Sequence, residues 1–96
     1  DILNLSKIPL MERYEKVYVS MHLHVDRQGK LKPTAIEWED GRAYKIDKVT
    51  DERMAPPAHV GAILARRYDV LVEGREKTVY LETPTNQWFV ERPLYE

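Results

Sequence analysis

The chain lacks cysteine, contains one phenylalanine and four glycines, and has no long apolar run. Without thiols it has no disulfides, no thiolate nucleophile and no Cys-ligated zinc, which favours a cytosolic protein over a small secreted one. No stretch of about 18 apolar residues is present and no signal-peptide pattern opens the chain, so we expect neither a membrane-spanning helix nor export. Net charge is −1, from 15 basic and 16 acidic residues. That balance excludes a global field that would recruit nucleic acid or anionic membrane.

The chain has 96 residues, 43% of them hydrophobic and 32% charged. These values are typical of one folded domain with a modest core, and they exclude a disordered chain. Met11 would make a natural start before the first strand. Asp1 to Leu10 are therefore either an added, extended or flexible start or a true N-terminal segment.

Alternation of apolar and polar residues runs through 16–26, where Val17, Val19, Met21 and Val25 share one side. A period of two sends successive side chains to opposite faces, which predicts a half-buried strand with one wet face. Similar segments follow at short intervals. We expect strands at residues 32–39, 42–50, 66–73, 76–83 and 87–91.

The turn signals between these segments are short, which is typical of an antiparallel meander. Asp40-Gly41 predicts a tight type I′ hairpin. Val49 falls out of phase with Ile46, which indicates a bulge or a bend that would curl the sheet. Pro33 lacks an N–H and is expected at a strand start or an edge.

The pattern predicts an all-β fold: a small antiparallel SH3-like barrel or strongly curved meander of five to six strands, with a two-layer open sheet as the alternative. The expected organisation is a flexible or short helical arm over 1–15, one β domain over 16–92 and a tail over 93–96. Both tryptophans are in phase with apolar neighbours and are expected in the core. Five residues should meet in one shared interior: Val19, Ile36, Tyr44, Val70 and Trp88.

Residues 51–65 form the irregular part, because two adjacent prolines remove two backbone donors. A loop of this kind in a small β domain is a natural place for contact with another protein. The interface candidates are Met54, Pro56, Pro57 and His59.

Two arginines followed by a tyrosine are the best nucleic-acid candidate. In small barrels, aromatic side chains stack bases while nearby cations hold phosphates. Arg66 and Arg67 would supply the charge, with Tyr18 and Tyr80 as stacking surfaces. Acidic residues are interleaved with the bases, so no unbroken basic stripe emerges.

His22 and His24 form an H-x-H pair on one face of the first strand. Two imidazoles at this spacing can converge on one zinc ion if a third ligand, such as His59, is near, but alternation alone also places two polar residues on a wet face. Glu37 and Glu39 share a strand face without a pocket. No nucleophile elbow or phosphate-binding loop is present, so the sequence predicts no enzyme, no catalytic residue and no cofactor.

Three motifs occur in order: Trp-Glu-Asp-Gly at 38–41, Tyr-Lys-Ile-Asp-Lys-Val at 44–49 and Trp-Phe-Val-Glu at 88–91. With them, residues 16–92 resemble a group of short bacterial proteins of unknown function. The resemblance implies a small β domain in a bacterial cytoplasm, and it brings no assigned catalytic or binding residue. Residues 55–64 depart from the Gly-rich, Lys-containing link typical of that group.

The function expected from the sequence is therefore a non-enzymatic cytosolic module for protein interaction or assembly, binding a protein partner or itself. Binding of single-stranded nucleic acid is the alternative, and metal binding through His22 and His24 is a third.

Overall fold

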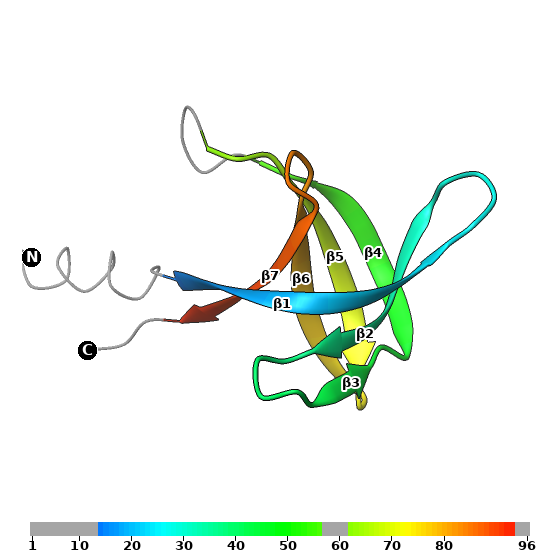
Figure 1. The fold of residues 1–96 in the computed structure, drawn as a ribbon, viewed down its shortest axis with the longest axis vertical. Coiled ribbons are helices and arrows are strands. Elements are labelled where there is room, and N and C mark those ends of the chain that lie inside the picture. The colour runs from blue at the N-terminus through cyan, green and yellow to red at the C-terminus, as the bar shows by residue number, and fades with distance from the viewer. Residues whose placement is uncertain (1–13, 57–61, 94–96) are drawn as a thin grey trace, which may run out of the picture.

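The computed structural model describes residues 14–56 and 62–93, which form an all-β half-barrel (Figure 1). Seven antiparallel strands alternate with short turns, and the described residues contain no helix. The strands are β1 (Tyr14–Val25), β2 (Leu31–Glu37), β3 (Ala43–Lys45), β4 (Lys48–Ala55), β5 (Ala65–Val72), β6 (Arg75–Glu82) and β7 (Gln87–Pro93).

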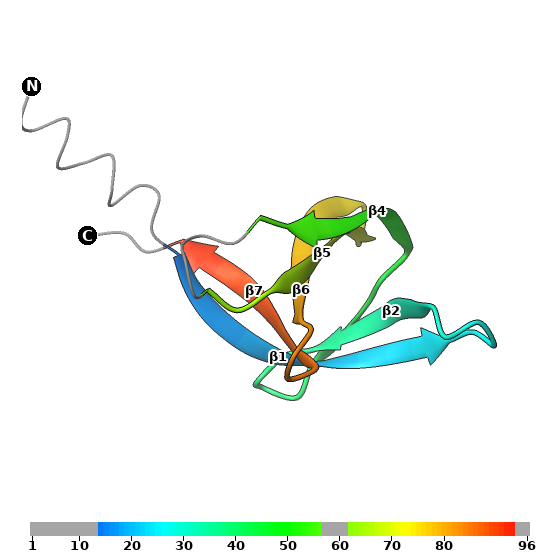
Figure 2. The same cartoon turned by 90° about the horizontal axis from the view of Figure 1, so that it is seen from above.

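The sheet has the order β3-β2-β1-β7-β6-β5-β4, so consecutive strands are adjacent except β3 and β4, which form the two edges, and the first strand joins the last. β1 makes this possible because its first half pairs with β7 and its second half with β2. Viewed from above, the sheet curls into an incomplete ring (Figure 2). A two-residue link crosses the gap at one end: Ile46 N–H donates to Thr34 at 2.9 Å, and Asp47 N–H donates to Leu71 at 2.8 Å.

Apolar side chains on the concave face of the curled sheet form one core, as the alternation predicts. Ile36, Val70 and Trp88 belong to the buried cluster, while Val19 and Tyr44 pack against it, so the expected shared interior is confirmed. The other buried members are Ile46, Tyr68, Val72, Val79 and Leu81. Trp88 is core, as expected, with its ring 5.1 Å from that of Tyr68. Trp38 is only half-buried and lies outside the cluster.

Two β-bulges keep apolar side chains facing inward at points where the alternation of apolar and polar residues shifts by one position. Thr34 is the extra residue opposite β1, and its hydroxyl donates to the His22 carbonyl at 3.0 Å. The bulge lets Pro33 face inward, where it is buried. Thr50 is the extra residue opposite β5, which brings Val49 into register with Val70. The bulge expected near Val49 is confirmed.

Strand number and boundaries differ from the prediction. The strand expected over 42–50 is two strands, β3 and β4, because the chain changes partner from β2 to β5 at the link 46–47. The irregular part expected from residue 51 begins later, since 51–55 continue β4 at the edge of the sheet, where polar residues are tolerated.

The ends of the domain also extend past the expected limits. Tyr14 and Glu15 belong to β1 and pair with Pro93 and Arg92 of β7. The remaining residues of the expected arm and tail (1–13 and 94–96) and residues 57–61 lie outside the described part of the chain.

The type I′ turn occurs at a different hairpin. Glu73 and Gly74 both have positive φ, 53° and 76°, as this turn requires. At the hairpin expected to have it, only Gly41 is left-handed, with φ 86°. Gly41 N–H donates to Trp38 at 2.9 Å, so this is a three-residue loop in which the left-handed glycine restores the strand twist.

Candidate functional site

β6 and β7 diverge after a short shared segment. They pair only through Tyr80 with Phe89, Leu81 with Trp88 and Glu82 with Gln87. Beyond this point β6 remains paired with β5, while β7 remains paired with β1 (Figure 1). We call the space between residues 75–79 of β6 and 90–92 of β7 the β6/β7 notch.

Backbone groups of three residues point into the notch without a backbone partner among residues 14–56 and 62–93. The two-residue turn at 73–74 closes on the hydrogen-bonded pair Val72–Arg75, and backbone direction alternates along an antiparallel strand. Glu76 and Thr78 therefore direct their N–H and C=O groups away from β5. Tyr80 and Phe89 bond each other, so by the same alternation Glu91 faces the notch from β7. No hydrogen bond among the described turns and loops uses these groups.

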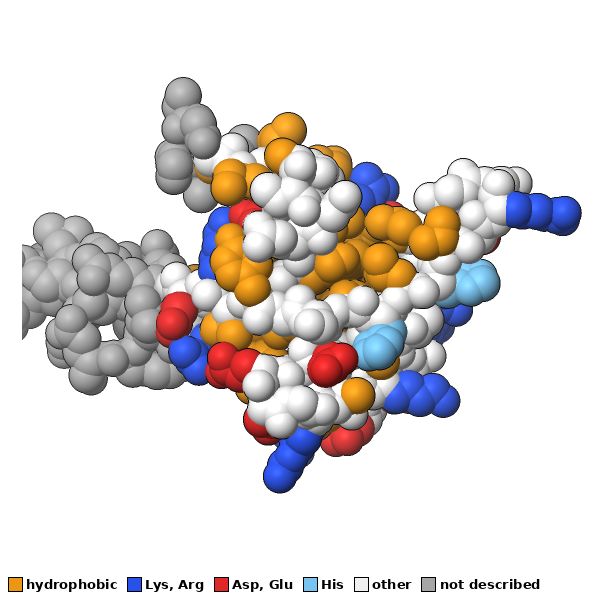
Figure 3. Space-filling model, viewed as in Figure 1, with side chains coloured by type: hydrophobic (Ala, Val, Ile, Leu, Met, Phe, Trp, Pro, Cys, Tyr) orange, Lys and Arg blue, Asp and Glu red, His pale blue; other side chains and the backbone are white. Residues whose placement is uncertain are grey.

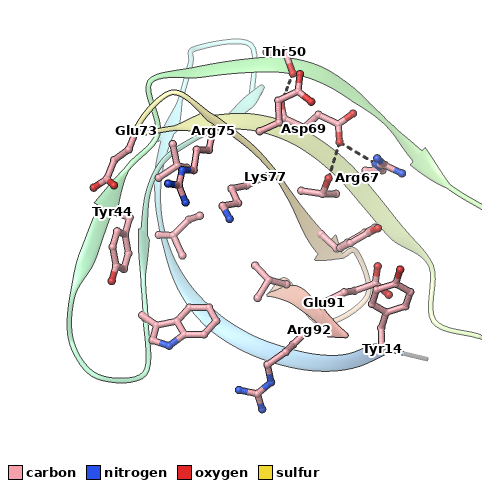
Figure 4. Close-up of a pocket in the computed structure, with 17 residues that line it drawn as sticks. Tyr14, Tyr44, Thr50, Arg67, Asp69, Glu73, Arg75, Lys77, Glu91 and Arg92 are labelled. Atoms are coloured by element: carbon pink, nitrogen blue, oxygen red, sulfur yellow. Dashed lines mark hydrogen bonds and ion pairs between the residues drawn. The ribbon is translucent and has the colours of Figure 1, made fainter. Parts of the chain in front are cut away.

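A cavity of about 1110 Å³ occupies the notch and continues into the interior of the half-barrel (Figure 4). Its concave wall is apolar and aromatic, formed by Ile36, Trp38, Tyr44, Val72 and Val90. Its charged lining is balanced. The cations are Arg67, Arg75, Lys77 and Arg92, and the acids are Asp69, Glu73, Glu76 and Glu91.

Three polar side chains on the outer side of the notch bond one another. Asp69 Oδ1 accepts hydrogen bonds from Arg67 Nε and Thr78 Oγ1, both at 3.0 Å. Burial opposes ionisation of Asp69, but these donors outweigh it and hold its pKa below the ordinary value. Burial, assisted by a hydrogen bond with Glu91, raises the pKa of Tyr80 to about 12. These groups stay in one protonation state near neutral pH.

Two cations on the concave side are different. Arg75 and Lys77 are exposed and make no ion pair with any residue that the structure describes. In Figure 4 both lie on the side of Tyr44, away from the Arg67–Asp69 pair. Arg92, by contrast, bonds Glu15 at 2.8 Å. Among the described residues, the two cations of the notch without an ion pair therefore both lie on β6, and the carboxylates of Glu73, Glu76 and Glu91 make no ion pair either.

On the outer face, a polar and aromatic cluster links the strands at the closed end of the notch, where β6 and β7 still pair. Lys16 Nζ and Tyr18 Oη each donate to the buried carboxylate of Glu82 at 2.9 Å. Burial alone would raise the pKa of Glu82, but the two donors outweigh it and lower the pKa. The Tyr18 pKa is raised, chiefly by the hydrogen bond to Glu82. Lys16 lies 4.7 Å over the Phe89 ring, which Tyr80 stacks at 4.9 Å.

The four nucleic-acid candidates do not share one surface. Arg66 and Arg67 are neighbours on β5 and point to opposite faces. Arg66 Nε bonds Glu52 at 2.8 Å on the concave side, and Arg67 bonds Asp69 on the outer side. Tyr18 and Tyr80 lie on the outer face with Arg67, flanking Phe89.

His22 and His24 share the outer face of β1, as the alternation predicts. His22 Nε2 lies 3.3 Å from Glu37 Oε2 in an exposed contact. Within residues 14–56 and 62–93 no group of three ligating side chains could hold a metal. His59 lies outside the described residues, so the metal site stays a prediction.

Of the interface candidates, Met54 lies near the end of edge strand β4 and is 47% exposed, and Pro56 follows that strand. Pro57 and His59 lie outside the described residues. β4 also borders a second cavity, of about 510 Å³, that separates it from the β1–β2 hairpin.

In the part of the chain that the structure describes, no strand pairs with the hairpin across this gap, and its inward-facing Leu23 and Val25 are 39% and 54% exposed. In Figure 3 hydrophobic side chains gather at the centre of the face, between the β6–β7 turn and the β1–β2 hairpin.

The alternating pattern did not predict the notch, although one signal was present. The inward-facing positions of β6 are apolar at Val79 and Leu81 but basic at Lys77 and Arg75. Cations at inward-facing positions indicate that the apolar core ends there, but they do not indicate that β7 separates from β6.

No family model, curated protein or solved structure matches the chain. The resemblance to a group of short bacterial proteins therefore stays a prediction. No helix among the described residues is long and apolar enough to span a membrane.

Proposed function

We propose that the protein is a non-enzymatic interaction module that captures an extended segment of another protein in the β6/β7 notch. The observation that supports this is the three-residue pairing of two longer strands, which leaves unpaired backbone edges facing one cavity. Residence in a bacterial cytoplasm is part of the proposal and rests on the sequence resemblance.

An extended polypeptide satisfies such an edge directly. Its backbone donors and acceptors would pair with those of Glu76 and Thr78, extending the sheet beside β6 by strand addition. Affinity then comes from the main chain, and side-chain pockets provide selectivity.

The two walls of the notch define the pattern of the captured segment. Side chains of a strand alternate between faces, so one set would meet the apolar concave wall with Tyr44 and Val90, and the other the polar outer side with Thr78 and Glu91. A segment whose side chains alternate between an inward-facing set, apolar opposite Val79, and a polar outward-facing set fits both walls.

The test separates backbone pairing from side-chain contact at one position. Peptides are selected from a displayed random library on the immobilised full chain, and their binding is measured to the wild type, Glu76→Ala and Glu76→Pro. Both variants remove the carboxylate, but only proline also removes the N–H that faces the notch. We expect selected peptides to bind Glu76→Ala like the wild type and to bind Glu76→Pro at least about tenfold more weakly, since a lost hydrogen bond and a ring in the pairing plane both oppose strand addition. Equal binding to all three proteins, or failure to select any peptide, would contradict the proposal.

A further inference from the structure

We infer that the segment captured in the notch carries carboxylate side chains that meet Arg75 and Lys77, so that the partner is an acidic, alternating extended segment of a different protein. This rests on the proposed function and adds the chemistry of the partner. The observation behind it is a pair of cations at inward-facing positions of β6 that make no ion pair with any described residue.

The register fixes where these cations point. Arg75 and Lys77 lie opposite Val72 and Val70 of β5, and therefore on the face that continues to Val79. A strand added beside β6 would place a side chain directly opposite each of them. Opposite charges in such cross-strand pairs stabilise the pairing, and like charges destabilise it. A carboxylate at these two positions and an apolar side chain opposite Val79 is the complementary pattern.

The same charges oppose capture of a second copy through β6. Antiparallel pairing of two β6 edges centred on Lys77 sets Lys77 against Lys77. Centred on Glu76, it sets Glu76 against Glu76 and Lys77 against Arg75. Charges on exposed strand edges commonly prevent edge-to-edge association in this way. The complementary occupant is therefore a different chain.

A nucleic acid would also supply negative charge beside Trp38 and Tyr44. The cavity lining carries as many acidic as basic side chains, so its net charge does not distinguish a phosphate chain from an acidic peptide. The unpaired N–H and C=O groups of Glu76 and Thr78 match a peptide backbone and have no counterpart in a phosphate chain. The observations therefore favour an acidic peptide.

The experiment uses two blocked peptides and one oligonucleotide on the full chain. The acidic peptide is Thr-Val-Thr-Glu-Thr-Glu-Thr, the basic peptide has Lys in place of both Glu, and the oligonucleotide is single-stranded oligothymidine. Each is titrated against the wild type, Lys77→Glu, and Lys45→Glu as a matched charge reversal on β3 outside the notch. Binding is followed by NMR shifts of the amides of residues 75–79.

We expect the wild type and Lys45→Glu to prefer the acidic peptide by about tenfold, since two cross-strand charge pairs change sign between the peptides. Lys77→Glu should weaken or reverse that preference. Equal binding of both peptides, lost in Glu76→Pro, would overturn the acidic partner and leave strand capture standing. No peptide-induced shift in any protein would count against both. Oligothymidine shifts that Lys77→Glu abolishes, without a response to the acidic peptide, would overturn the inference in favour of nucleic acid.

Discussion

The Lys16 ammonium lies 2.9 Å from the Glu82 carboxylate, although 66 positions of sequence separate the two residues. The contact links β1 to β6 over the top of β7, with the Phe89 ring beneath it. It ties the three strands together at the closed end of the notch. The side chain of Glu82 is 1% exposed and that of Lys16 is 46% exposed, so solvent screens one partner of an otherwise buried pair.

We expect Glu82→Gln to lower the free energy of unfolding at pH 7 by about 1 to 2 kcal/mol, because two donors lose a charged acceptor and solvent already weakens the pair with Lys16. The pH dependence should change as well. The Glu82 pKa is lower in the folded protein, so its contribution is complete above the ordinary glutamate pKa of 4.5 and is lost as pH falls through the lower folded value. Urea unfolding from about pH 6 to pH 3 measures both effects.

In that series the wild type should lose more stability on acidification than Glu82→Gln does. Glu76→Gln, which removes one exposed carboxylate, is the control and should follow the wild-type profile. Parallel curves for the wild type and Glu82→Gln would show that the carboxylate does not carry this acid sensitivity.

Amide hydrogen exchange checks the backbone directions assigned to the notch. The N–H groups of Lys77 and Val79 bond β5, whereas those of Glu76 and Thr78 face the cavity. We expect the first pair to exchange at least about a hundredfold more slowly than the second in the free protein, because exchange of paired amides requires opening of the ladder. Similar protection at all four positions would mean that the edge is paired.

Proline substitution tests the same alternation through stability. Glu76→Pro removes no hydrogen bond to β5, so we expect a loss of about 1 kcal/mol or less, as tolerated on strand edges. Lys77→Pro removes a ladder hydrogen bond and leaves a β5 carbonyl without its donor, so it should cost about 1 to 3 kcal/mol more than Glu76→Pro. Thermal unfolding distinguishes the two, and a reversed order would refute the register.

Gly41 provides an independent test of the β2–β3 hairpin. Its φ of 86° lies in the left-handed region, and no atom lies within 4 Å of the position that a Cβ would occupy, so a side chain meets backbone strain without a clash. We expect Gly41→Ala to cost about 1 kcal/mol and Gly41→Asn less, since asparagine tolerates this conformation best. Chemical denaturation measures the difference, and equal losses for the two variants would point to a different turn geometry.

The alternating pattern predicted the interior well because burial of one strand face is a local property of the sequence. Val19, Ile36 and Val70 face inward at positions that the period of two assigns. β4 was only partly foreseen, since an edge strand with polar residues on both sides, such as Glu52 and Arg53, leaves no alternation to detect.

The notch could not be foreseen because it depends on pairing between distant segments. Past Phe89, β7 stays beside β1 and separates from β6, and no residue of β6 or β7 indicates this separation locally. Trp38 illustrates the same limit. Its phase matches that of Ile36, but it lies just past the end of β2, beside the cavity.

The pairing of Tyr14 with Pro93 has a consequence for engineering. The points where the chain enters and leaves the domain are adjacent, so the domain can be grafted into an exposed loop of a host protein without stretching that loop. The same adjacency permits a circularly permuted version that is opened at the Asp26–Lys30 turn. In that version β6 and β7, the two strands that border the notch, remain intact.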